Sequence, residues 1–150
     1  MKSEISTPQF RSATLNALFA ALPALHELPE PQAQLVRAFR LTVLFGKAGK
    51  CPIAHIAPMI GGVASAAQFV RVVHVLGAHW HDAIRIYRPC CPQISPDEIL
   101  LLNLINAMVL RDAAAFRAMV RDILDEAATA AVQTEIAAFT ANHIRPRHAI

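Results

Sequence analysis

The sequence predicts an all-α protein that forms a single compact domain of six or seven helices, with one short extended segment around residues 84–88. Hydrophobic residues make up 55% of the chain, above the usual range of about 45–50%, and much of the excess is alanine, the strongest helix former. Apolar residues also recur at steps of three and four along most of the sequence. The domain is expected to cover residues 1–150, with 1–6 and 144–150 as loosely ordered tails.

Proline and glycine separate three helical patterns in the first half of the chain. Thr7-Pro8 is typical of a helix start, and apolar residues follow at helical spacing over 15–22. Pro31 opens a second helix, which the glycines of residues 46–49 close. A short segment and a Gly-Gly turn come next, and the apolar stripe of a third helix then runs over 66–80.

The middle of the chain departs from helical spacing. Residues 83–88 alternate apolar and charged side chains, a period of two that indicates extended backbone. A lone strand has no sheet to join within this chain. We therefore expect the segment to pack as an extended linker or to pair with a copy of itself.

A strong helix start follows at residues 95–98. Ser95 is expected to cap the backbone N–H of Glu98, and Glu98 to reach back to Ser95, with Pro96 in the first turn. The helix that follows is apolar nearly all round, which predicts a central position. Its polar exceptions, Asn103 and Asn106, are expected to be buried and bonded to each other or to a neighbouring backbone.

Two more helical patterns complete the chain. Asp112 is expected to cap a helix with an apolar stripe over 116–124, on which Arg121 and Asp125 form a favourable pair. A last helix continues over 132–139.

The charge balance argues for protein partners rather than nucleic acid. Charged residues make up 17% of the chain, below the usual figure of about 25%, so we expect a homo-oligomer and a further protein partner. A net charge of +3 is too small to indicate nucleic-acid binding. We interpret the main basic cluster as a solvated face rather than a phosphate site. Its members are Arg37, Arg40, Lys47 and Lys50.

The sequence suggests a cytoplasmic protein that does not enter the membrane. Its start has no apolar stretch of the kind that a secretory signal needs. Between Lys50 and Arg71 there are 20 uncharged residues, enough to span a bilayer. Prolines, a histidine and the Gly-Gly turn interrupt them, so this stretch is interpreted as two short helices.

Three cysteines are the main candidates for chemistry. The odd count argues against a disulfide framework. Cys90 and Cys91 are adjacent, and His79 and His81 lie close before them, so a mixed Cys/His zinc site with Cys51 is one hypothesis. Adjacent cysteines do not match the usual two-residue gap of zinc sites.

Two other interpretations of the cysteines stay open. Cys51-Pro52 and Cys91-Pro92 are similar to the short haem-regulatory motif. The third interpretation is structural: Pro89 and Pro92 stiffen a connector, and the cysteines are small apolar plugs. We favour the structural interpretation and expect no cofactor.

Enzyme motifs are not evident. The sequence has no G-x-S-x-G, no phosphate-binding glycine loop and no dinucleotide fingerprint. Asp97 and Glu98 are neighbours that face different directions on a helix, so they make poor acid–base partners. No catalytic residue is assigned.

The segment Cys90-Cys91-Pro92-Gln93-Ile94-Ser95-Pro96-Asp97-Glu98 resembles the core motif of a small bacterial family of uncharacterised function. A looser likeness includes Arg40, residues 43–45 and residues 69–76, and it extends to about Leu124. The resemblance implies a compact helical cytoplasmic protein with the Cys-Cys-Pro segment as its hallmark, and it implies no activity.

Our first hypothesis is therefore a non-enzymatic helical interaction or regulatory module that self-associates. The alternative is a thiol, haem or metal sensor that uses Cys90-Cys91-Pro92 with Cys51 or a nearby histidine. A small enzyme is the third hypothesis.

Overall fold

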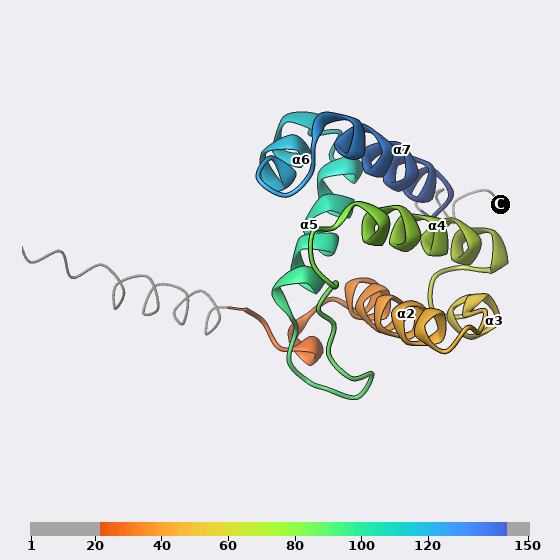
Figure 1. The fold of residues 1–150 in the computed structure, drawn as a ribbon. Coiled ribbons are helices and arrows are strands. Elements are labelled where there is room, and N and C mark those ends of the chain that lie inside the picture. The colour runs from red at the N-terminus through yellow and green to blue at the C-terminus, as the bar shows by residue number, and fades with distance from the viewer. Residues whose placement is uncertain (1–21, 144–150) are drawn as a thin grey trace, which may run out of the picture.

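A computed structural model describes residues 22–143 and places six α-helices and one 3-10 helix in them (Figure 1). The elements are η1 (Leu25–Glu27), α2 (Glu30–Lys47), α3 (Ile53–Ile56), α4 (Val63–His79), α5 (Pro96–Val109), α6 (Ala113–Val120) and α7 (Glu126–His143). This part of the chain contains no β-strand, and the all-α prediction is confirmed. Residues 7–21 of the helix expected over 7–22, and both expected tails, lie outside the described residues.

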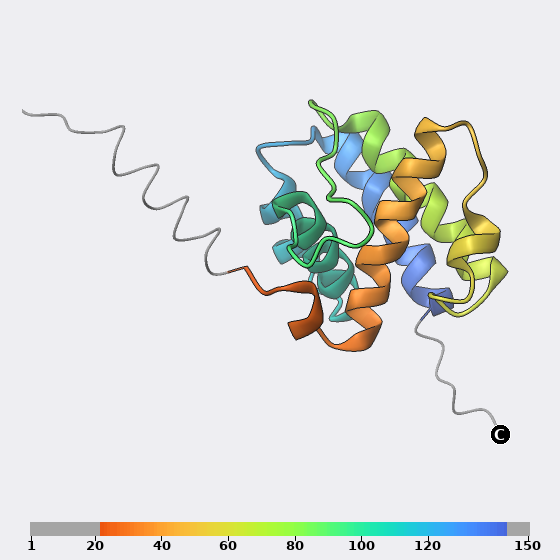
Figure 2. The same ribbon diagram turned by 90° about the horizontal axis from the view of Figure 1, so that it is seen from below.

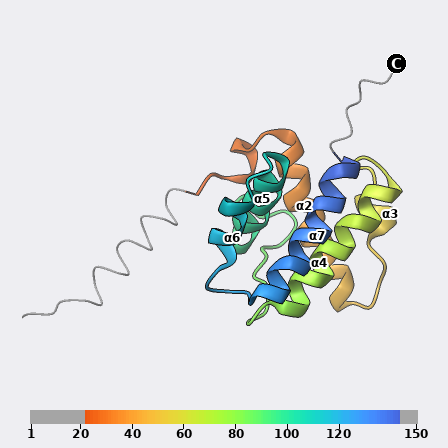
Figure 3. The ribbon, with the colours of Figure 1, turned by 90° about the horizontal axis from the view of Figure 1, so that it is seen from above.

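Helices α2, α4 and α7 are stacked on one another, and α5 crosses them at one end (Figure 1). Figure 3 shows α4 and α7 side by side, and the rings of Phe69 and Phe139 pack between them with centroids 5.3 Å apart. Helix α6 packs against α5 and α7. Within residues 22–143, no helix has both the length and the apolar character that crossing a bilayer requires.

Helix α5 contributes to the core as expected, but it lies at one end of the stack and not at its centre (Figure 1). Leu101 and Leu104 on this helix are almost completely buried. The expectation for Asn103 and Asn106 is wrong, because both side chains are exposed. The two asparagines lie three residues apart, so they share one face of the helix, and that face is turned to solvent.

The predicted start and end of α2 are confirmed, as is the Gly-Gly turn before α4. Pro31 lies in the first turn of α2, and the chain leaves this helix through Gly49, whose φ is +68°. Gly61 and Gly62 have φ values of +93° and +125°, which side chains rarely tolerate. Glycine is therefore required between α3 and α4.

Helix α5 ends in a Schellman motif, and Asp112 then caps α6 as predicted. Asp112 donates its N–H to the Ala107 carbonyl at 2.8 Å, and Arg111 donates to Met108 at 3.1 Å. The Asp112 carboxylate accepts the Ala115 N–H at 3.0 Å.

The expectation of one helix through 116–124 is wrong, because α6 ends at Val120 and the chain turns before α7. Asp125 does not pair with Arg121 as expected. Its carboxylate accepts the Ala128 N–H at 2.7 Å instead and satisfies a backbone donor in the first turn of α7. The stripe of apolar residues marks the buried side of this region and not the length of its helix.

Candidate functional site

Residues 80–95, called the connector below, join α4 to α5. The connector lies between α2 and α5 (Figure 2). Ile84 and Ile86 pack against the core, whereas Arg85 and Arg88 are exposed. The alternating pattern thus predicted an extended linker correctly, and no strand forms in the connector.

Residues 88–93 form a tight surface loop, called the Cys-Cys-Pro turn below. Cys91 donates its N–H to the Arg88 carbonyl at 2.9 Å, with Pro89 at the position of the turn that its fixed φ favours. Leu25 donates to the Pro92 carbonyl at 2.7 Å and ties the turn to η1.

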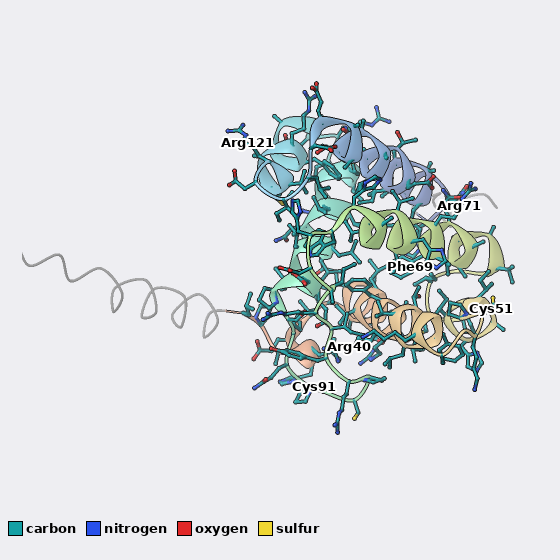
Figure 4. All side chains as sticks on the ribbon, in the orientation of Figure 1. Arg40, Cys51, Phe69, Arg71, Cys91 and Arg121 are labelled. Atoms are coloured by element: carbon teal, nitrogen blue, oxygen red, sulfur yellow. The ribbon has the colours of Figure 1, made fainter. Side chains whose placement is uncertain are left out.

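The side chain of Arg40, which projects from α2, fills the inner side of this turn. Figure 4 places it between α2 and the connector, close to Cys91. The carbonyls of Arg88 at 3.1 Å, Pro89 at 3.5 Å and Cys91 at 2.8 Å share the two hydrogens of its Nη1, and its Nη2 donates to the Gln93 carbonyl at 2.5 Å. One guanidinium thus binds four backbone carbonyls of the turn.

A carboxylate from the start of α5 neutralises the guanidinium. Arg40 Nε donates to Glu98 Oε1 at 2.7 Å, and Nη2 donates to Oε2 at 3.0 Å. Both side chains have no exposed surface. A bidentate pair of this kind sets the relative orientation of the two side chains and also balances their charges.

The backbone of the connector satisfies the remaining polar atoms of Glu98. Its carboxylate accepts the N–H groups of Ser95 at 2.8 Å and Tyr87 at 3.1 Å. Ser95 Oγ accepts the Glu98 N–H at 3.1 Å, which confirms the predicted capping box, and donates to the Arg85 carbonyl at 2.7 Å. Among residues 22–143 no buried side-chain nitrogen or oxygen lacks a hydrogen-bond partner.

This network corrects the interpretation of the basic cluster. Arg40 is not on a solvated face but is the largest fully buried side chain of the described residues. Arg37 does lie on the surface, where it pairs with Glu30 at 3.3 Å. A signal for Arg40 was present, because it follows the buried Ala33 and Val36 at helical spacing.

The two cysteines of the turn differ in exposure. Cys90 is exposed, so the apolar-plug interpretation is wrong for it, whereas Cys91 is half-buried; Cys51 is also exposed. The physical reason is that the turn directs its carbonyls inward to Arg40. The Cys90 side chain therefore lies at the surface.

Of the predicted metal ligands, His81, Cys90 and Cys91 lie on the connector, His79 ends α4, and Cys51 lies on a different loop. Cys51 precedes α3, far from Cys91 (Figure 4), and His79 and His81 are exposed at the end of α4. In residues 22–143 no group of three or more His, Cys, Asp or Glu side chains is placed to hold a metal ion. The haem hypothesis for the two Cys-Pro pairs stays a prediction.

A pocket of about 440 Å³ lies on another side of the connector, next to the start of α5. Its lining includes the aromatic residues Trp80 and Tyr87 and the carboxylates of Asp82 and Asp97. Asp97 accepts the Arg85 N–H at 2.7 Å, so this wall of the pocket is joined to the same network.

Comparison with protein-family models, curated proteins and solved structures finds no match to this chain. The resemblance to the Cys-Cys-Pro family therefore stays a prediction. The candidate site rests on the geometry described above.

Proposed function

We propose that this protein is a non-enzymatic regulatory module that responds to ligands or modification at the thiols of the Cys-Cys-Pro turn. The observation that carries the proposal is the placement of Arg40. Its buried guanidinium holds four carbonyls of the turn from inside, while Cys90 stays exposed outside.

The proposal explains why a charge pair is buried at this place. Removing two charges from water is costly, and an apolar pair of similar size often gives equal or greater stability. What the pair of Arg40 and Glu98 provides here is a fixed shape for an exposed loop. Loops that a rigid scaffold positions are a common place for binding residues.

The same contacts connect the turn that carries the thiols to the packing of helices α2 and α5. A ligand that displaces the turn changes the carbonyl contacts of Arg40, which belongs to α2. Arg40 in turn holds Glu98 in the first turn of α5. Binding at the surface would therefore alter the contact between two core helices.

Self-association is the second part of the proposal. Val109 and Leu110, at the end of α5, leave 40% and 68% of their surfaces exposed. Exposed apolar neighbours of this size favour contact with a second copy. Sedimentation equilibrium tests this part: we expect a dimer or larger species that Leu110→Asp dissociates, and a monomer at all concentrations would refute self-association.

Hydrogen exchange tests the proposed response. Iodoacetamide would be used to alkylate a Cys51→Ser protein, and amide exchange would then be measured at Tyr87, Ser95 and Glu98. These amides bond to the network and not to the thiols, so we expect their exchange to accelerate.

The matched control is the protein with Cys90→Ser and Cys91→Ser, in which only Cys51 reacts. Its amides in the connector should exchange at the same rate before and after alkylation. Faster exchange confined to residues 88–93 in the test protein would contradict the proposal, because alkylation would then leave the amides of the buried network unaffected.

A further inference from the structure

We infer that Cys90 and Cys91 together form a two-thiol site for a soft, thiophilic ligand that needs only two protein donors, namely trivalent arsenic. The inference rests on the proposed function, because it names the ligand to which the turn responds. It starts from two cysteines that are neighbours in sequence and lie on one surface turn, Cys90 exposed and Cys91 half-buried.

The backbone geometry disfavours a disulfide between the two cysteines. A trans peptide bond joins them, and it sets their Cα atoms about 3.8 Å apart. Disulfides usually join Cα atoms about 4.4–6.8 Å apart. The Arg40 contacts on both sides of the pair prevent the backbone from adjusting easily. The thiols therefore remain available as a reduced pair.

The donor count distinguishes between soft ligands. A structural zinc ion needs four ligands. No such group is assembled in the described part of one chain. Trivalent arsenic needs only three ligands, which two thiolates and one hydroxyl supply. Its pyramidal geometry keeps the two sulfur atoms close together, and one bridging atom makes the ring larger than that of a disulfide.

The binding step is a ligand exchange without oxidation or reduction. Arsenous acid loses two hydroxyl groups, and each takes the proton of one thiol and leaves as water. Two As–S bonds replace two As–O bonds, and the third hydroxyl stays on arsenic. Because the buried guanidinium already holds the turn, little conformational freedom is lost when the ring closes.

Arsenite and phenylarsine oxide are suitable probes, and the readouts are the number of titratable thiols and the intact mass. In the Cys51→Ser protein we expect one arsenic per chain and the loss of both remaining thiols. Cys90→Ser or Cys91→Ser, each added to Cys51→Ser, should weaken binding about 100-fold, because the second As–S bond forms within the molecule.

Three results would overturn the inference: loss of only one thiol per arsenic, equal affinity in the single-thiol proteins, or arsenic that joins two chains. Circular dichroism of each variant shows whether it is folded, and folding is the expected result because none of the three cysteines is fully buried. Failure here is distinct from failure of the proposed function. Alkylation could still accelerate amide exchange without arsenic binding, and arsenic could bind without changing the exchange of the network amides.

Discussion

Two loops of this protein place a Cys-Pro pair before a helix, and they are held by different means. The loop before Cys51 is closed by its own backbone: Lys50 donates to the Phe45 carbonyl at 2.8 Å, and Gly49 takes a φ of +68°. The Cys-Cys-Pro turn is held by Arg40, which lies 51 residues before Cys91 in the sequence. The shape of the first loop is therefore local, whereas that of the second depends on the whole fold.

The comparison indicates where a change at the surface can reach the core. Displacing the loop before Cys51 breaks backbone hydrogen bonds to the last turn of α2. Displacing the Cys-Cys-Pro turn disturbs a buried pair that joins α2 to α5. Of the two cysteine loops, only the second contacts this buried pair, as the proposed function requires.

The largest expected effect is the loss of the buried pair. Arg40→Ala should lower the free energy of unfolding by about 3–5 kcal/mol, because it leaves the Glu98 carboxylate buried without its partner. Urea denaturation measures the loss. Limited trypsin digestion should at the same time show faster cleavage after Arg85 and unchanged cleavage after Lys50.

Arg37→Ala is the matched control for this change, three residues earlier on the same helix. Its pair with Glu30 is partly exposed, so we expect a loss of about 0–1 kcal/mol. If Arg40→Ala were no more destabilising than Arg37→Ala, the guanidinium would not be what holds the turn.

A smaller effect is expected from the cap of α5. Ser95→Ala should cost about 1–2 kcal/mol, because the hydroxyl both caps Glu98 and donates to the Arg85 carbonyl. Thermal unfolding followed by circular dichroism measures it. Asp112→Ala removes an exposed cap of α6, so a smaller loss is expected there; a larger one would argue against a special role for the buried cap.

For the loop before Cys51, stability should depend on backbone conformation and not on a distant side chain. Gly49→Ala should cost about 1 kcal/mol through its positive φ alone, since a Cβ at this position has open space around it. Chemical denaturation measures the loss. The control is Gly46→Ala, which lies inside α2 in equally open space and should stabilise by about 0.5–1 kcal/mol. Equal effects at both positions would contradict the local account of this loop.

The smallest effect is expected from the thiols themselves. Cys51→Ser and Cys90→Ser should each change the free energy of unfolding by less than about 0.5 kcal/mol, because both side chains are exposed. Urea denaturation of the two variants measures this. A large loss for Cys90→Ser would mean that its sulfur packs against the protein after all.

Local signals in the sequence predicted much of the fold. Pro31, the Gly-Gly turn, the capping box at Ser95 and the cap at Asp112 each involve residues within one turn of each other, so the sequence contains both partners side by side. The alternation of residues 83–88 indicated in the same way which side of the connector faces the core.

The site was predicted only in part, because its main contact is not local. The Cys-Cys-Pro turn was singled out, but the partner of Glu98 is 58 residues away, and a charged residue is normally expected at the surface. The sulfur atoms were placed inside for a related reason. Cysteine is often buried, but here backbone carbonyls occupy the inner side of the turn.

The long separation between Arg40 and Glu98 also bears on the order of folding. A chain that grows from its N-terminus completes α2 well before Glu98 is synthesised, 58 residues after Arg40. The guanidinium remains hydrated in that interval, because closing so long a loop costs entropy that only the later contacts repay. The Cys-Cys-Pro turn therefore acquires its shape late, when the first turn of α5 docks, and its thiols are free to react with the surroundings in the nascent chain before they become part of an ordered surface.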